Sequence, residues 1–150
     1  MRDKKHGEFT ISTNKDYLDR HIIFDFLHTD AYWSENIPKE IVMKSIDQTP
    51  LVFGVYKGDV HTLYEQVGFA RVITDSATFA YLCDVFILPA YRGLGLSKWL
   101  VETIVWHHDL QDIRKFMLAT KDAHTLYERF GFEAVDQPEL ILQKVRKIPY

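Results

Sequence analysis

The most constraining feature of the sequence is the stretch 84–100 (DVFILPAYRGLGLSKWL), where an apolar run leads through a glycine-containing turn into a helical pattern. Glycines allow positive φ angles and let the backbone come close to a ligand. The free N–H groups and positive dipole end of the following helix favour phosphate oxygens, and Arg92 can add a charge-assisted contact. The stretch therefore predicts an anion site; a tight turn with a solvated Arg92 is the alternative.

Two familiar phosphate loops do not fit this stretch. The Walker pattern fails because no Gly-Lys-Ser/Thr follows at the required spacing. The dinucleotide fingerprint is also incomplete, because Lys98 stands where its third glycine is needed after Gly93 and Gly95. A nucleotide-phosphate module is therefore the least favoured function.

Hydrophobic periodicity predicts an α/β (α+β mixed) fold with one mixed sheet flanked by helices. Strands are expected over residues 8–12, 51–56, 66–74, 78–88 and 114–120, with strand-like sequence again at the C-terminal end. Helices are expected over 17–28, from Pro38 with Ile41, Val42 and Ile46 inward, after Gly95, and from a cap at Asp122 to an αL glycine at Gly131. Because no linker or repeat divides the chain, residues 1–150 are expected to form a single domain.

Composition narrows the class of protein. With 47% hydrophobic and 26% charged residues the chain is of ordinary globular type, and a net charge of -3 argues against general nucleic-acid binding. No apolar run approaches membrane-spanning length. Cys83 is the only cysteine, so no intramolecular disulfide can form. These features favour a cytoplasmic protein without nucleic-acid or membrane partners.

Two motifs carry a resemblance to a known family. Residues 92–97 (RGLGLS) resemble the Gln/Arg-x-x-Gly-x-Gly/Ala signature of the GNAT superfamily of acyl-CoA-dependent N-acetyltransferases, with Ser97 replacing the usual last small residue. Downstream, residues 123–132 (AHTLYERFGF) resemble the family's Ala-x-x-x-Tyr-x-x-x-Gly-Phe block. The resemblance implies a GNAT-like domain: a mixed, mostly antiparallel sheet with splayed parallel strands four and five, flanked by about four helices.

The resemblance also implies acetyl-CoA as the co-substrate, with its pantetheine arm in the splay and its pyrophosphate on the glycine loop. Thr120 stands where the family often has Asn, which weakens a side-chain contact there. The cofactor-binding residues implied are Val85, Phe86, Ile87, Arg92, Gly93, Leu94, Gly95, Leu96, Ser97, Thr120 and Ala123.

Catalytic roles follow from the same resemblance. Tyr127 matches the family's general acid, because a phenol with a pKa near ~10 is protonated at neutral pH; a packed core tyrosine is the alternative. Asp84 is the candidate base for the attacking amine, directly or through water. Its alternative is a structural carboxylate bonded to neighbouring backbone or to Arg71.

The acceptor pocket is expected near the aromatic loop 31–36, where Trp33 could pack over an ammonium group and Glu35 could pair with it. Phe79 and Tyr81 could line the same pocket, and for all these aromatics simple packing is the alternative. The expected acceptor is a small-molecule or peptide amine. Exposed sheet edges are compatible with a homodimer.

Two further kinds of chemistry are not expected. The histidines match no recognised metal-site spacing, so no metal is predicted. Burial next to Asp84 should raise the pKa of the Cys83 thiol, which argues against an acyl-cysteine route. The functional hypothesis is transfer of the acetyl group of acetyl-CoA to a primary amine in a ternary complex, and the alternative is a CoA-binding sensor without turnover.

Overall fold

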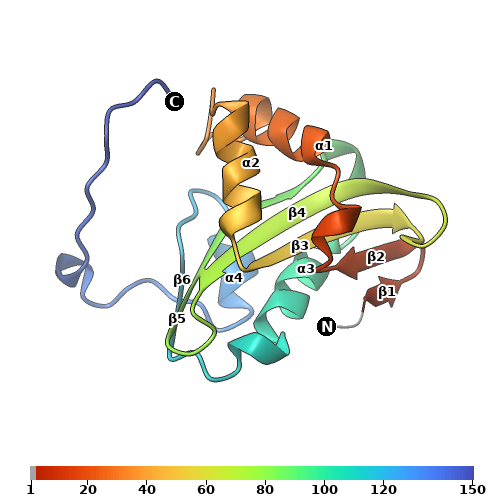
Figure 1. Cartoon of the computed structure of the whole chain (residues 1–150). Coiled ribbons are helices and arrows are strands. Elements are labelled where there is room, and N and C mark those ends of the chain that lie inside the picture. The colour runs from red at the N-terminus through yellow and green to blue at the C-terminus, as the bar shows by residue number, and fades with distance from the viewer. Residues whose placement is uncertain (1–2) are drawn as a thin grey trace.

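The computed structural model describes residues 3–150 (Figure 1). Its centre is a six-stranded sheet whose strands follow one another in chain order. Neighbouring strands are antiparallel except the last two, which run parallel. The strands are β1 (Lys4–His6), β2 (Phe9–Ser12), β3 (Leu51–Gly58), β4 (Tyr64–Thr74), β5 (Phe79–Ile87) and β6 (Lys115–Leu118). The predicted mixed, mostly antiparallel sheet is confirmed.

Helices cover both faces of the sheet (Figure 1). One apolar core joins α1 and α2 to β3, β4 and β5, and it contains the stacked rings of Phe26 and Phe86, 4.0 Å apart. The other core joins α3 and the tyrosine of α4 to the strands. The helices are α1 (Arg20–Asp25), α2 (Lys39–Gln48), α3 (Leu96–Val105) and α4 (His124–Glu128). None of the helices in residues 3–150 is both long and apolar enough to cross a membrane.

Three details of the predicted helices are wrong. The first helix, α1, begins only at Arg20, because the Asp19 carboxylate accepts hydrogen bonds from the backbone N–H groups of residues 21 and 22. On α2, Ile41 is 37% exposed rather than inward. Asp122 does not cap α4; the N-cap is Ala123, whose N–H donates to Thr120 Oγ1 at 3.1 Å.

The C-terminal end also differs from its prediction. Residues 133–150 contain no strand and only one short 3-10 turn, Pro138–Leu140. Their side chains are all exposed, and the segment runs outward from the sheet at the left of Figure 1. The segment makes no backbone hydrogen bond to residues 3–132, so its backbone groups gain no strand partner there.

Candidate active site

An opening between β5 and β6 is the centre of the site. Strand pairing between them runs only from Phe79↔Lys115 to Leu82↔Leu118. Beyond Leu82, Asp84 adopts a positive φ of 54°, and the register with β4 shifts at this point. Such a bulge adds twist and bends its strand. The β6-facing backbone of residues 83–87 is therefore left without a strand partner within the described chain, as expected for splayed strands.

The glycine loop lies at the carboxyl end of β5. Gly93 and Gly95 have φ angles of 83° and 79°, and a Cβ atom on either would meet nothing within 4 Å. These glycines are thus required by the backbone conformation and not by neighbouring packing. The Arg92 Nε–H donates to the Ile87 carbonyl at 3.0 Å, which ties the loop to the end of β5.

The N-terminus of α3 opens onto this loop. Its N-cap is Gly95, and no side chain caps the first turn. The first N–H groups of a helix have no partner within it, and they carry its positive dipole end. Combined with the open space beside both glycines, this arrangement can accept an anion such as a pyrophosphate.

Tyr127 is the buried residue of α4 and belongs to the main core. Its side chain is 7% exposed, and its ring packs edge-on against Phe132 at 5.9 Å. Burial, with smaller contributions from Tyr32 and Asp122, raises the pKa of Tyr127 to about 12. The hydroxyl is therefore protonated throughout the neutral range, and no hydrogen-bond partner for it is found among residues 3–150.

The aromatic loop between α1 and α2 bridges the opening. Tyr32 Oη accepts a hydrogen bond from the backbone N–H of Lys121 at 2.9 Å, just before α4. Trp33 Nε1 donates to Asp84 Oδ1 at 2.9 Å, on β5. The two rings pack edge-on, 5.1 Å apart. Sequence reasoning singled out Trp33 but missed Tyr32, because its partner is a backbone group 89 positions away.

Both carboxylate oxygens of Asp84 accept hydrogen bonds from side chains. Besides accepting from Trp33, it accepts from Arg71 Nε at 2.6 Å. Arg71 also donates to Thr49 Oγ1 at 3.0 Å, and the Asp84 and Arg71 side chains are only 11% and 16% exposed. Both oxygens of this nearly buried carboxylate already accept from a side-chain donor, one of them a guanidinium. The ion pair with Arg71 agrees with the alternative in which Asp84 is a structural carboxylate.

Of the two other aromatic candidates on β5, Tyr81 lies near the opening and Phe79 does not. Tyr81 is close enough to Cys83 and Asp84 for both to raise its pKa, after burial. Phe79 lies at the opposite end of β5 and is 39% exposed, so the structure does not bring it to the opening. Burial raises the pKa of the Cys83 thiol to about 11, as predicted, so that residue is a protonated thiol at neutral pH.

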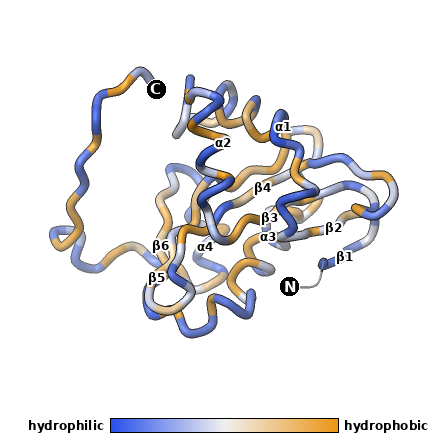
Figure 2. Tube along the Cα trace, viewed as in Figure 1, coloured by the Kyte–Doolittle hydropathy of each residue, from blue (hydrophilic) through white to orange (hydrophobic). Residues whose placement is uncertain are grey.

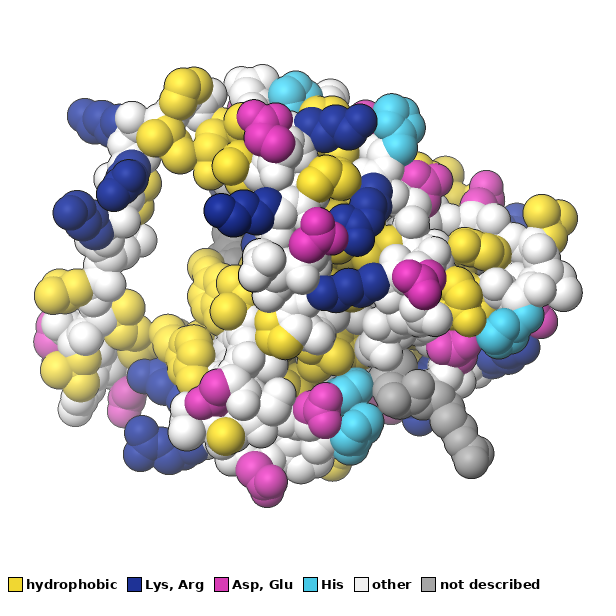
Figure 3. Space-filling model, viewed as in Figure 1, with side chains coloured by type: hydrophobic (Ala, Val, Ile, Leu, Met, Phe, Trp, Pro, Cys, Tyr) yellow, Lys and Arg dark blue, Asp and Glu magenta, His cyan; other side chains and the backbone are white. Residues whose placement is uncertain are grey.

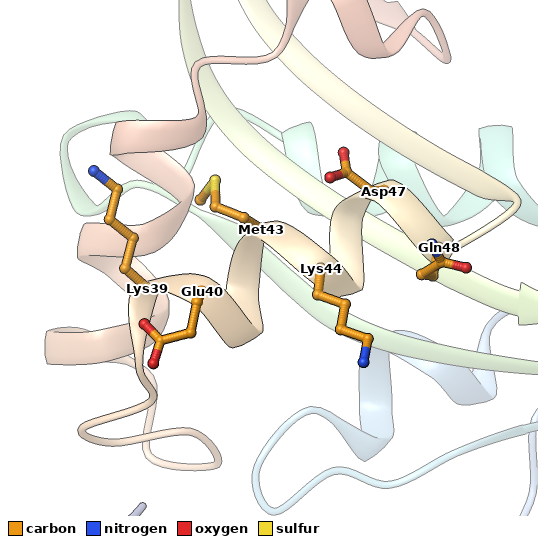
Figure 4. Close-up of a pocket in the computed structure, with 6 residues that line it drawn as sticks. All are labelled: Lys39, Glu40, Met43, Lys44, Asp47 and Gln48. Carbon is orange, nitrogen blue, oxygen red and sulfur yellow. The ribbon is translucent and has the colours of Figure 1, made fainter.

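Other surface features lie apart from this site. A hollow of about 530 Å³ is lined only by side chains of α2, which spread along one side of that helix (Figure 4). Its walls come from one element, so no side chains converge on it from opposite sides. A hollow of about 490 Å³ lies beside α3, where His107, His108 and Asp109 come together. There the His107 Nδ1 atom already accepts from the Asp109 N–H at 3.1 Å.

Comparison with known proteins agrees with this architecture. Residues 53–134 match the family model described as an acetyltransferase (GNAT) domain. A Gibberella zeae protein described as an acetyltransferase is 30% identical over 140 residues, which cover 81% of this chain and 76% of that protein. The crystal structure of a Xanthomonas campestris protein, assigned to the GNAT family of acetyltransferases, matches with a TM-score of 0.86 and 42% identity, covering 95% of this chain and 96% of that one.

A further relative has a narrower match. The [ribosomal protein bS18]-alanine N-acetyltransferase of Haemophilus influenzae is 31% identical over 75 residues, which cover 47% of this chain and 49% of that protein. The family model, the Gibberella zeae relative and the Xanthomonas campestris structure all lead to the same assignment. This chain belongs to the GNAT family and is an acetyltransferase.

Proposed function

We propose that this protein transfers the acetyl group of acetyl-CoA to a primary amine by direct attack in a ternary complex. Membership of the GNAT family implies acetyl-CoA as co-substrate and an amine as acceptor. The observation that carries the proposal is the unpaired backbone of residues 83–87, with the glycine loop at its end. The Haemophilus influenzae relative, named for acetylation of an alanine amino group, is consistent with an amine acceptor.

Acetyl-CoA would lie along the opening. The pantetheine amides would pair with the backbone of Val85, Phe86 and Ile87 as an added strand does. The pyrophosphate would lie on the N–H groups of the loop and first helical turn, from Arg92 through Gly93, Leu94, Gly95 and Leu96 to Ser97. Thr120 and Ala123 would border the pantetheine arm, although the Thr120 hydroxyl already accepts the Ala123 N–H.

The chemistry requires one bond to form and one to break. The amine nitrogen attacks the thioester carbonyl and forms the C–N bond, while the carbonyl oxygen gains negative charge. A backbone N–H near Val85 is the proposed donor to that oxygen. As the C–S bond breaks, the Tyr127 hydroxyl gives its proton to the departing sulfur. The proton that the attacking nitrogen loses passes to water, and water returns a proton to Tyr127 before the next turnover. With its pKa raised to about 12, Tyr127 holds that proton at neutral pH.

For Asp84 we propose a positioning role. Its carboxylate fixes the indole of Trp33 at 2.9 Å while its charge is balanced by Arg71 at 2.6 Å. Trp33 is thereby held at the edge of the opening, where an aromatic face can receive an ammonium group. In this arrangement Asp84 acts on the acceptor amine by holding Trp33 in place, and it does not take a proton from that amine.

Asp84→Asn is expected to raise KM for the amine about 10-fold while changing kcat less, because a hydrogen bond to a charged group contributes about 1.5–3 kcal/mol. The acidic limb of the kcat pH profile should stay in place. Trp33→Phe, which removes the indole donor but keeps an aromatic ring, should reproduce the KM effect. A collapse of kcat in Asp84→Asn together with loss of the acidic limb would instead make Asp84 the base.

The proposed activity is tested with the purified full chain, acetyl-CoA and a panel of primary amines: aliphatic amines, amino sugars and peptides with free N-termini. We expect at least one class to give an acetylated product by mass spectrometry, with one free thiol released per product. Thiol release without product would contradict the proposal. Acetyl-CoA binding with no turnover on any class would favour a CoA sensor.

A further inference from the structure

One face of the sheet carries an apolar row that no helix of residues 3–150 packs on. Ile73 of β4, Tyr81 of β5 and Met117 of β6 are direct partners across the three strands. Residues directly opposite one another point to the same face of a sheet, so these three side chains form one row, here called the apolar row. The residues that alternate with them point to the other face, into the core beside α3: Val72, Ala80, Leu82, Phe116 and Leu118.

The apolar row is left open on the side of the sheet that α1 and α2 partly cover. Those helices pack on other side chains of β3, β4 and β5, and neither core of the described chain includes a residue of the row. Ile73 is 47% exposed, and Tyr81 and Met117 are half-buried. Figure 2 shows mainly hydrophobic residues along β5 and β6, and in Figure 3 hydrophobic side chains lie at the left edge of the body, where Figure 1 draws these strands. A contiguous exposed apolar surface indicates a binding site for another molecule.

The apolar row adjoins the opening in which acetyl transfer is proposed. Strand pairing between β5 and β6 ends one residue beyond the row, at Leu82↔Leu118. On the same face of the sheet Arg71 binds Asp84 at 2.6 Å, and Asp84 holds Trp33 Nε1 at 2.9 Å. A molecule that lies on the row therefore has one end beside Trp33 and the start of the unpaired backbone, next to the proposed place of the reacting carbonyl.

The charges on this face indicate which kind of molecule fits it. Within the segments 71–74, 79–84 and 115–118, Asp84 is the only acidic residue, and it is paired with Arg71. Asp75, in the turn before β5, is bonded to residues 77–79 of its own turn. Lys115 is exposed at the outer end of the row. A second ammonium group on an acceptor would find no free counter-ion over the row, whereas an apolar body gains free energy by leaving water.

We propose that the acceptor of this enzyme is a monoamine with an apolar alkyl or aromatic body, which lies on the apolar row while its amine reaches the opening beside Trp33. The inference rests on the acetyl transfer proposed above and adds the class of acceptor to it. The transfer step is unchanged: the amine nitrogen gains the acetyl group and loses a proton, and CoA leaves as the thiol. The row binds only the part of the acceptor that does not react.

Hexylamine and 1,6-diaminohexane are a matched pair of acceptors, because they differ only in a second amine at the far end. With saturating acetyl-CoA, the full chain should acetylate hexylamine with a kcat/KM at least about 10-fold above that of the diamine, which must bring a second charge over the row. Hexylamine should also exceed butylamine roughly 15-fold, since each buried methylene contributes about 4-fold. Equal values for the three amines would overturn this inference and leave acetyl transfer intact. No acetylation of any amine would overturn both.

Ile73→Glu tests whether the acceptor body lies on the apolar row. The new carboxylate should lower kcat/KM for hexylamine about 10-fold and raise it for 1,6-diaminohexane, because it supplies the missing counter-ion. Leu63→Glu adds the same charge at an 84% exposed residue in the turn between β3 and β4, so it should leave both values unchanged.

Two further measurements make the result of Ile73→Glu decisive. Circular dichroism checks that the variant is folded, and calorimetric titration checks that it still binds acetyl-CoA. Wild-type selectivity in a folded variant that binds acetyl-CoA would overturn the proposal. If the same variant also changed the sedimentation coefficient, the row would be a contact between protein chains and not the acceptor site.

Discussion

Tyr127→Phe is expected to lower kcat by about 10²- to 10⁴-fold, the usual contribution of a positioned general acid. The variant keeps the buried ring and its packing against Phe132 but removes the proton that the departing sulfur needs. The affinity for acetyl-CoA should stay within a few-fold of wild type, because the proposed pyrophosphate site lies on another element. Steady-state kinetics with calorimetric titration separate the two effects.

The pH profile adds a second readout for this residue. Because the pKa of Tyr127 is raised to about 12, its acid form persists as pH rises, and the wild type should show no loss of kcat from this group below about pH 11. Tyr56→Phe is the matched control: it makes the same change at a buried tyrosine of β3 whose hydroxyl lacks a partner within the described chain. If Tyr127→Phe retained wild-type kcat, Tyr127 would be a core residue only.

Gly95→Val should weaken acetyl-CoA binding at least about 10-fold. The φ of Gly95 is 79°, a conformation that costs an ordinary residue about 1–2 kcal/mol and a β-branched one more. The new side chain would also occupy the open space in front of the first N–H groups of α3, where the pyrophosphate is proposed to lie. Calorimetric titration with acetyl-CoA measures the loss.

Gly7→Val provides the matched control for that change. Gly7 has a φ of 58°, and a Cβ there also meets nothing within 4 Å, but it lies in the turn between β1 and β2. Both variants should lose similar thermal stability, since both strain the backbone. Only Gly95→Val should lose affinity for acetyl-CoA. Equal affinity in the two variants would remove the glycine loop from the binding site.

Local patterns were sufficient for much of the fold and for one part of the site, the glycine loop. Alternating and buried runs predicted β3, β4 and β5, because side-chain period and turn residues are encoded within each strand. Gly93 and Gly95 predicted the loop before α3 for the same reason. Each of these features depends on residues that are near one another in the chain.

Features that depend on distant partners could not be predicted. The bulge at Asp84 comes from a register shift against β4, and its only local signal is that Asp tolerates positive φ. The bridge formed by Tyr32 needs a backbone N–H of residue 121, brought near only by the folded sheet. The end of the chain carries a strand-like local pattern, but it forms no strand and no backbone hydrogen bond with residues 3–132.

Calorimetric titration of the wild-type chain with acetyl-CoA, repeated with NAD and ATP, shows whether the opening between β5 and β6 binds this co-substrate. We expect one acetyl-CoA bound per chain at micromolar affinity, displaced by CoA. Binding of both nucleotides should be far weaker, because they lack the pantetheine arm that would pair with residues 85–87. Absence of acetyl-CoA binding, or equal affinity for NAD and ATP, would contradict the proposed use of the opening between β5 and β6.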